Sequence, residues 1–199
     1  IPDDLQQLDH QLADQHICNF SVFQSLLDHW AFGALFPIVP IHRLNERPTL
    51  QSTLVDITCD SDGKVSKFID KDNDVRETIP LHAIDDGKPY YLGIFLTGAY
   101  QDIMGDLHNL FGRVNEVHVF LDEDEECGYY LEKTIEGNTI GDVLRMTQYD
   151  ERELNMKLRS QVDTAIKQDK LKPTEGIRLL QEYERGLKDQ TYLHFPVPR

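Results

Sequence analysis

The sequence has little cysteine, fewer basic than acidic residues, and no long apolar run. Its three cysteines, Cys18, Cys59 and Cys127, are odd in number and far apart, which argues against a disulfide framework and a paired metal motif and indicates reduced thiols. Against 35 Asp and Glu stand 20 Lys and Arg, a formal charge of -15. We therefore expect no nucleic acid and no anionic membrane as partners, whereas a cationic ligand suits the charge.

No apolar run approaches the roughly 20 residues that a membrane-spanning helix needs. The first residues, Ile1 to Asp4, are neither basic nor apolar like a signal peptide, so we expect a cytoplasmic protein. With 40% hydrophobic and 28% charged residues, the composition is that of a folded globular protein. The chain opens on Ile1 rather than on methionine, which indicates a fragment or a processed product.

The first part of the chain is predicted to be helical. From residue 3 to about 36, apolar residues recur three and four positions apart, beginning with Leu5, Leu8 and Leu12 and continuing through residues 20–27. Prolines then mark an irregular connector, because proline lacks an amide hydrogen and disfavours helix in its predecessor. These prolines are Pro37, Pro40 and Pro48.

The middle of the chain is predicted to consist of strands separated by turns that carry Gly and Asp. The clearest runs are residues 53–58, 65–69, 90–96 and 117–121. One helix is expected among them, over residues 99–110, directly after Gly98. Beyond Gly137 the pattern becomes helical again, with a capping box at Thr139–Asp142. The elements together predict an α+β fold.

Generic metal motifs do not fit this sequence. When Gly63 is aligned with the sixth position of an EF-hand loop, Ile69 stands at the twelfth, where a glutamate is needed. The next Asp-rich turn places Val75 at the glycine position. Among the eight histidines no pair has the i, i+4 spacing of a helical zinc motif. We therefore predict no metal site from spacing.

Two short motifs contain residues that could take part in chemistry, but residue physics alone favours a structural role for both. A cysteine at the end of an apolar strand, such as Cys59, is most often a small buried hydrophobe, and Asp60 to Gly63 make an ordinary turn. Gly98 and Tyr100 provide tight geometry and packing at the start of a helix, which is equally a natural phosphate site.

Cys59-Asp60 and Gly98-Ala99-Tyr100 resemble, in order and spacing, the Cys-Asp and Gly-Ala-Tyr signatures of the fold-type-III basic amino acid decarboxylases. Further stretches are similar to the arginine decarboxylases of that family, namely residues 19–26, 36–40, 56–64, 98–103 and 108–112. The resemblance continues to Thr191–Leu193 and so covers nearly the whole chain.

The resemblance implies a β-sandwich or barrel-like β-domain flanked by helical modules, with the TIM-like barrel of the family absent from this chain. Residues 1–45 would be the end of a helical insertion and a connector, 46–135 the β-domain, and 136–199 a C-terminal helical extension. The Schiff-base lysine that binds pyridoxal phosphate would lie in the absent barrel, and no lysine here matches it.

The resemblance further implies pyridoxal-phosphate-dependent conversion of L-arginine to agmatine and carbon dioxide in polyamine biosynthesis, with Mg²⁺ as an additional ion. Cys59 would protonate the substrate at Cα, and Asp60 and His108 would face the substrate. Gly98 and Tyr100 would contact the cofactor phosphate. Cys59 and Asp60 would complete the site of a partner subunit, which implies a homodimer or larger homo-oligomer and an inactive isolated chain.

Two alternatives stay open. The chain could be a non-catalytic regulatory or interaction module related to decarboxylases, or part of a decarboxylase for ornithine, lysine or carboxynorspermidine. The joint presence of Cys59, Asp60 and Tyr100 favours an enzyme, because an interaction module does not need all three. The helical extension and the flanking motifs favour arginine.

Overall fold

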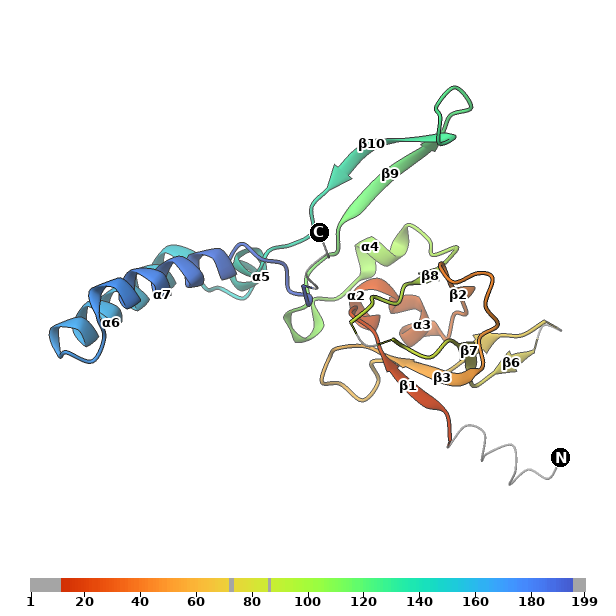
Figure 1. Ribbon diagram of the computed structural model, residues 1–199, viewed down its shortest axis with the longest axis horizontal. Coiled ribbons are helices and arrows are strands. Elements are labelled where there is room, and N and C mark those ends of the chain that lie inside the picture. Colours follow the sequence, from red (N-terminus) through yellow and green to blue (C-terminus); the bar gives the residue numbers. More distant parts are fainter. Residues whose placement is uncertain (1–11, 72–73, 86, 195–199) are drawn as a thin grey trace. The chain divides into compact units, whose positions relative to one another are not determined.

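The computed structural model describes residues 12–71, 74–85 and 87–194, which form two compact units (Figure 1). One unit comprises the chain up to Asn109 together with the chain from Leu193, and the other comprises Leu110–Tyr192. The predicted mixture of helices and strands is confirmed, whereas the division at residues 45 and 135 stays a prediction. Leu5, Leu8 and His10 lie outside the described residues. No helix in the described part of the chain is long and apolar enough to cross a membrane.

The first unit is built on a four-stranded sheet in which β3 (Leu50–Val55) pairs with all three other strands. Its partners are β1 (Asp14–Ile17) in parallel, and β4 (Lys64–Val65) and β7 (Ile79–Leu81) antiparallel. Two antiparallel pairs accompany this sheet: β2 (Ile38–Pro40) with β8 (Leu92–Ile94), and β5 (Phe68–Ile69) with β6 (Val75–Arg76). The predicted strands of this region are confirmed with changed bounds: the strand expected at 53–58 begins three residues earlier as β3, the one at 65–69 divides into β4 and β5, and the one at 90–96 shortens to β8.

The prediction of helix at residues 14–17 is wrong, because this segment forms β1. Asp14 pairs with Ser52 and Ile17 with Val55, and the ladder continues where the Cys18 N–H donates to the Val55 carbonyl at 2.8 Å. Within β1 only His16 is buried, so the segment is held mainly by its ladder to β3. Pairing with a buried neighbour outweighs a local helical pattern, since helix propensity is a weak prior.

The helical prediction is confirmed at residues 22–32, as α2 (Val22–Ser25) and α3 (Leu27–Phe32). The Ser21 hydroxyl caps α2 by accepting the Gln24 N–H at 3.3 Å. α3 ends at Gly33, whose φ of 68° lies in the left-handed region that glycine adopts without strain. Apolar residues of α2 and its C-cap pack on the sheet in a core that comprises Val22, Leu26, Ile38, Leu54, Val65, Phe68, Ile79 and Leu81.

The helix predicted over residues 99–110 is less than half as long as expected, with five residues. α4 (Tyr100–Met104) ends at Gly105, and a separate 3₁₀ turn, η1, follows at His108–Leu110. A side chain at Gly105 would place a Cβ 2.5 Å from the Gln24 carbonyl oxygen, so glycine is needed where the chain passes α2. The chain therefore turns at Gly105, and His108 lies on a different element from Tyr100.

The second unit contains a hairpin and three helices (Figure 1). β9 (Glu116–Leu121) and β10 (Tyr129–Ile135) form the antiparallel hairpin, and the helices are α5 (Ile140–Met146), α6 (Glu151–Lys167) and α7 (Pro173–Gly186). The predicted capping box at the start of α5 is confirmed, because Thr139 and Asp142 exchange hydrogen bonds. Bonds from the Thr139 backbone and hydroxyl lower the pKa of the Asp142 carboxyl.

Candidate active site

The turn after β3 carries two of the predicted site residues, and a buried carboxylate fixes it in place. Asp56 accepts the Val22 N–H through Oδ2 at 2.8 Å and the Thr58 N–H through Oδ1 at 2.8 Å. Asp56 therefore ties the end of β3 to the first residue of α2. Any side chain at Gly63 would overlap this carboxylate, which explains the glycine at that position. The sequence signal for Asp56 was only an acidic residue at a strand end.

The Cys59 thiol is free and exposed. The interpretation of Cys59 as a buried hydrophobe is therefore wrong, because the residue lies at the surface of the described chain. Cys18, by contrast, is partly buried and packs beside the core. Desolvation raises the pKa of its thiol from 9.0 to about 11. The two cysteines differ because Cys59 lies in the turn, whereas Cys18 directly follows β1.

The structure brings Asp60 and His108 together across 48 positions of sequence. The Nε2 atom of His108 lies 3.0 Å from Oδ2 of Asp60, and the two side chains are 31% and 35% exposed. The other carboxylate oxygen, Oδ1, accepts the Asp62 N–H at 2.9 Å. Each oxygen of Asp60 thus has a partner within the chain, while a third of the side chain stays open to solvent.

Two aromatic residues from the segment predicted to be helical support this pair. The ring centroid of Phe23, on α2, lies 4.2 Å from that of His108. Trp30, on α3, packs edge-on to Phe23 at 5.2 Å and donates its Nε1–H to Oδ2 of Asp62 at 3.3 Å. No spacing rule points to these contacts, because apolar positions in a predicted helix are ordinarily core.

Gly98 and Tyr100 lie at the start of α4, and both are exposed to solvent. Tyr100 is 69% exposed, and no heavy atom lies within 4 Å of where a Cβ on Gly98 would stand. A phenol O–H donor beside open space fits the phosphate end of pyridoxal phosphate. Among the contacts of the described residues, none joins Tyr100 to the Asp60–His108 pair. The structure therefore assembles Asp60 with His108 and leaves Tyr100 as a separate contact point.

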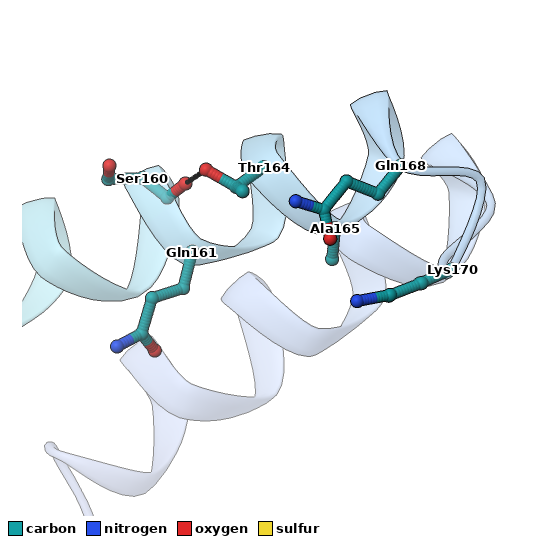
Figure 2. Close-up of a pocket in the computed structure, with 6 residues that line it drawn as sticks. All are labelled: Ser160, Gln161, Thr164, Ala165, Gln168 and Lys170. Atoms are coloured by element: carbon teal, nitrogen blue, oxygen red, sulfur yellow. Dashed lines mark hydrogen bonds between the residues drawn. The ribbon is translucent and has the colours of Figure 1, made fainter.

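An open depression of about 310 Å³ lies on the C-terminal helices (Figure 2). Its residues are distant in sequence from the candidate site residues described above. Its lining comes from α6 and the segment that follows it, and comprises Ser160, Gln161, Thr164, Ala165, Gln168 and Lys170. Ser160, Gln161, Thr164 and Gln168 carry hydroxyl or amide groups, and the Thr164 hydroxyl donates to the Ser160 carbonyl at 2.8 Å. Within the described ranges no cluster of three or more His, Cys, Asp or Glu is placed to hold a metal ion.

Known proteins resemble this chain along nearly its whole length. Residues 140–193 match the family of the arginine decarboxylase C-terminal helical extension. The biosynthetic arginine decarboxylase of Gloeobacter violaceus is 48% identical over 195 residues, which are 97% of this chain and 30% of that protein. That of Deinococcus radiodurans is 49% identical over 195 residues, 98% of this chain and 29% of that protein.

A solved structure shares the fold. The crystal structure of the biosynthetic arginine decarboxylase from Campylobacter jejuni matches with a TM-score of 0.77 and 35% identity, over 90% of this chain and 29% of that one. The chain thus spans less than a third of the length of these relatives. By sequence and by fold, this chain is similar to a part of the biosynthetic arginine decarboxylases, and its residues 140–193 match their C-terminal helical extension.

Proposed function

We propose that this chain is the part of a pyridoxal-phosphate-dependent arginine decarboxylase that supplies a proton donor and a substrate-binding carboxylate. The observation that carries the proposal is the exposed Cys59 next to Asp60. His108 and the Asp62 backbone N–H each contact one oxygen of the Asp60 carboxylate and hold it in place. These residues belong to a chain nearly half identical to proteins named for this activity. The reaction converts L-arginine to agmatine and carbon dioxide and serves polyamine biosynthesis.

In the corresponding arrangement of the whole enzyme, residues 46–135 form the β-domain of a fold-type-III decarboxylase, and residues 136–199 form its helical extension. Residues 1–45 are the end of the helical insertion. The barrel that holds the cofactor comes from the rest of the protein. Exposure of Cys59 and Tyr100 supports this assignment, because groups that act on molecules held elsewhere must be accessible.

Cys59 acts as the proton donor. Pyridoxal phosphate, when bound, supplies the electron sink that lets carbon dioxide leave the substrate. The carbon left behind needs a proton, and a thiol is protonated at neutral pH yet acidic enough to transfer its proton. Exposure of Cys59 supports this role, because the donor must reach a substrate bound to another part of the enzyme.

Asp60 binds the guanidinium at the far end of arginine. A carboxylate accepts about four hydrogen bonds, and Asp60 uses one position on each oxygen within the chain. One position on each oxygen therefore stays available for the two parallel N–H bonds of a guanidinium. The chain's formal charge of -15 also favours a cationic substrate.

Tyr100 and Gly98 contact the cofactor phosphate. The Tyr100 O–H donates a hydrogen bond, and Gly98 leaves room for the phosphate to approach the backbone. Cys59 and Asp60 complete the site of a partner subunit, so the working enzyme is a homodimer or a larger homo-oligomer. Mg²⁺ is an accessory ion of that assembly by the same resemblance.

The substrate assignment is tested by measuring turnover of arginine, ornithine, lysine and carboxynorspermidine by the complete protein and its Asp60→Asn variant. We expect arginine to be preferred and the substitution to raise KM for arginine about tenfold or more, because it removes a charge-assisted hydrogen-bond pair. Asp163→Asn, an exposed carboxylate on α6, is the matched control and should change nothing. Preference for another amine, or no turnover, would contradict the assignment; the latter result fits a non-catalytic module.

A further inference from the structure

The Asp60 carboxylate belongs to a closed ring of contacts. His108 Nε2 lies 3.0 Å from Asp60 Oδ2, and the His108 ring packs on Phe23 at 4.2 Å. Phe23 meets Trp30 edge-on at 5.2 Å, and the Trp30 Nε1–H donates to Asp62. The Asp62 N–H in turn donates to Asp60 Oδ1 at 2.9 Å. The series of contacts therefore closes on the Asp60 carboxylate, where it began.

This ring is anchored to the buried part of the first unit. Phe23 is 2% exposed, and its carbonyl accepts the Asp106 N–H at 3.0 Å, which draws the segment before His108 against α2. The Asp56 carboxylate likewise holds the turn that carries Asp60 to the first residue of α2. Both partners of the Asp60–His108 pair are thus fixed to the same short helix.

The two hydrogen bonds to Asp60 restrict rotation of its carboxylate. Because one partner lies on each oxygen, turning the group about its Cβ–Cγ bond would break both bonds. A guanidinium is a planar fork whose paired bonds require a carboxylate in a defined plane, whereas an ammonium is a point charge with rotatable donors. A fixed carboxylate therefore favours a guanidinium over an ammonium.

We propose that His108 and Trp30 are positioning residues that hold the plane of the Asp60 carboxylate and so set the preference for guanidinium over ammonium substrates. His108 acts directly on Asp60, and Trp30 acts through Asp62. The inference rests on the proposed function, since it explains how the substrate carboxylate selects arginine. It also replaces the expectation that His108 itself faces the substrate.

The first test is a set of His108 variants in the complete protein. His108→Phe keeps a ring against Phe23 but deletes the hydrogen bond to Asp60, so KM for arginine should rise about tenfold with little change in kcat. His108→Gln keeps an N–H donor and should restore KM most of the way to the wild-type value. Trp30→Phe keeps the edge contact, deletes the bond to Asp62, and should raise KM by a smaller factor, about threefold.

The second measurement separates positioning from general damage. Inhibition constants for agmatine and 1,5-diaminopentane report guanidinium and ammonium binding at the same site. Their ratio should favour agmatine in the wild type and fall in His108→Phe, whereas a change in folding alone would weaken both inhibitors alike. His118→Phe, on the hairpin, is the matched histidine control and should leave KM and the ratio unchanged.

The outcomes distinguish this inference from the proposed function. If Asp60→Asn raises KM while His108→Phe leaves both KM and the inhibitor ratio at wild-type values, the positioning role is overturned and the substrate assignment stands. If Asp60→Asn has no effect, the substrate assignment itself fails. A tenfold rise in KM for His108→Phe that His108→Gln does not reverse would also contradict a role through hydrogen bonding.

Discussion

Cys18 and Cys59 show how the same side chain takes different properties from its surroundings. Cys18 follows β1 and packs beside the core, and burial raises the pKa of its thiol to about 11. Cys59 stands exposed in the turn after β3. Because the Cys18 thiol is shielded and keeps its proton, it is inert at neutral pH, whereas the exposed Cys59 can meet a substrate to which it gives its proton.

The raised pKa of Cys18 predicts a pH-dependent stability at the residue scale. In the folded chain the thiol keeps its proton up to about pH 11, whereas in the unfolded chain it loses it near 9.0. The stabilisation is therefore fully present below about pH 9 and is lost as pH rises toward about 11, a change on the order of 2–3 kcal/mol. We expect urea unfolding to show this decline in the wild type and not in Cys18→Ala.

Tyrosines and lysines also titrate in this pH range, but they are the same in the wild type and in Cys18→Ala. The difference between the two proteins in free energy of unfolding therefore reports the Cys18 thiol alone. Cys127→Ala removes an exposed thiol and should keep the wild-type pH dependence. Parallel curves for the wild type and Cys18→Ala would show that burial does not hold the proton.

At the scale of elements, the turn after β3 depends on the absence of a side chain at Gly63. Gly63→Ala would push a methyl group into the Asp56 carboxylate and the Thr58 side chain and so break the bond from Asp56 to α2. We expect the free energy of unfolding to fall by about 2–3 kcal/mol, as for other buried hydrogen-bond networks.

Gly186→Ala is the matched control for that change. No heavy atom lies near a Cβ at Gly186, the last residue of α7, so alanine should be neutral or stabilise by up to about 1 kcal/mol. Urea unfolding of both variants gives the comparison. A Gly63→Ala protein as stable as Gly186→Ala would contradict the role assigned to Asp56.

The sequence predicts elements well where local signals are complete and poorly where distant partners decide. The capping box at Thr139 predicts the start of α5, and β-branched runs predict β3 and β9. β1 is missed because its pairing with β3 is invisible in a local helical pattern. The end of α4 is missed because Gly105 is needed for close passage beside Gln24, a contact between distant segments.

The same distinction applies to the site. Resemblance points to Cys59, Asp60 and Tyr100, whereas residue physics alone favours a structural role for these motifs. The contact between Asp60 and His108 spans 48 positions, so no spacing rule predicts it. Phe23 and Trp30 lie in the segment predicted to be helical, and only the fold reveals that they support His108 and Asp62.

At the scale of the whole molecule, the proposed chemistry needs more protein than this chain provides. The chain spans less than a third of its relatives, and Cys59 and Tyr100 are exposed rather than enclosed around a cofactor. These 199 residues alone should therefore release no carbon dioxide from arginine in the presence of pyridoxal phosphate.

The most direct test of the account measures agmatine and carbon dioxide formed from arginine by the complete protein and by its Cys59→Ala variant. Cys127→Ala, which removes another exposed free thiol, is the control. Loss of a general acid at Cα predicts agmatine formation reduced about a hundredfold or more, with a larger share of turnover diverted to abortive transamination. Unchanged turnover and products in Cys59→Ala would contradict the central claim that this thiol delivers the proton.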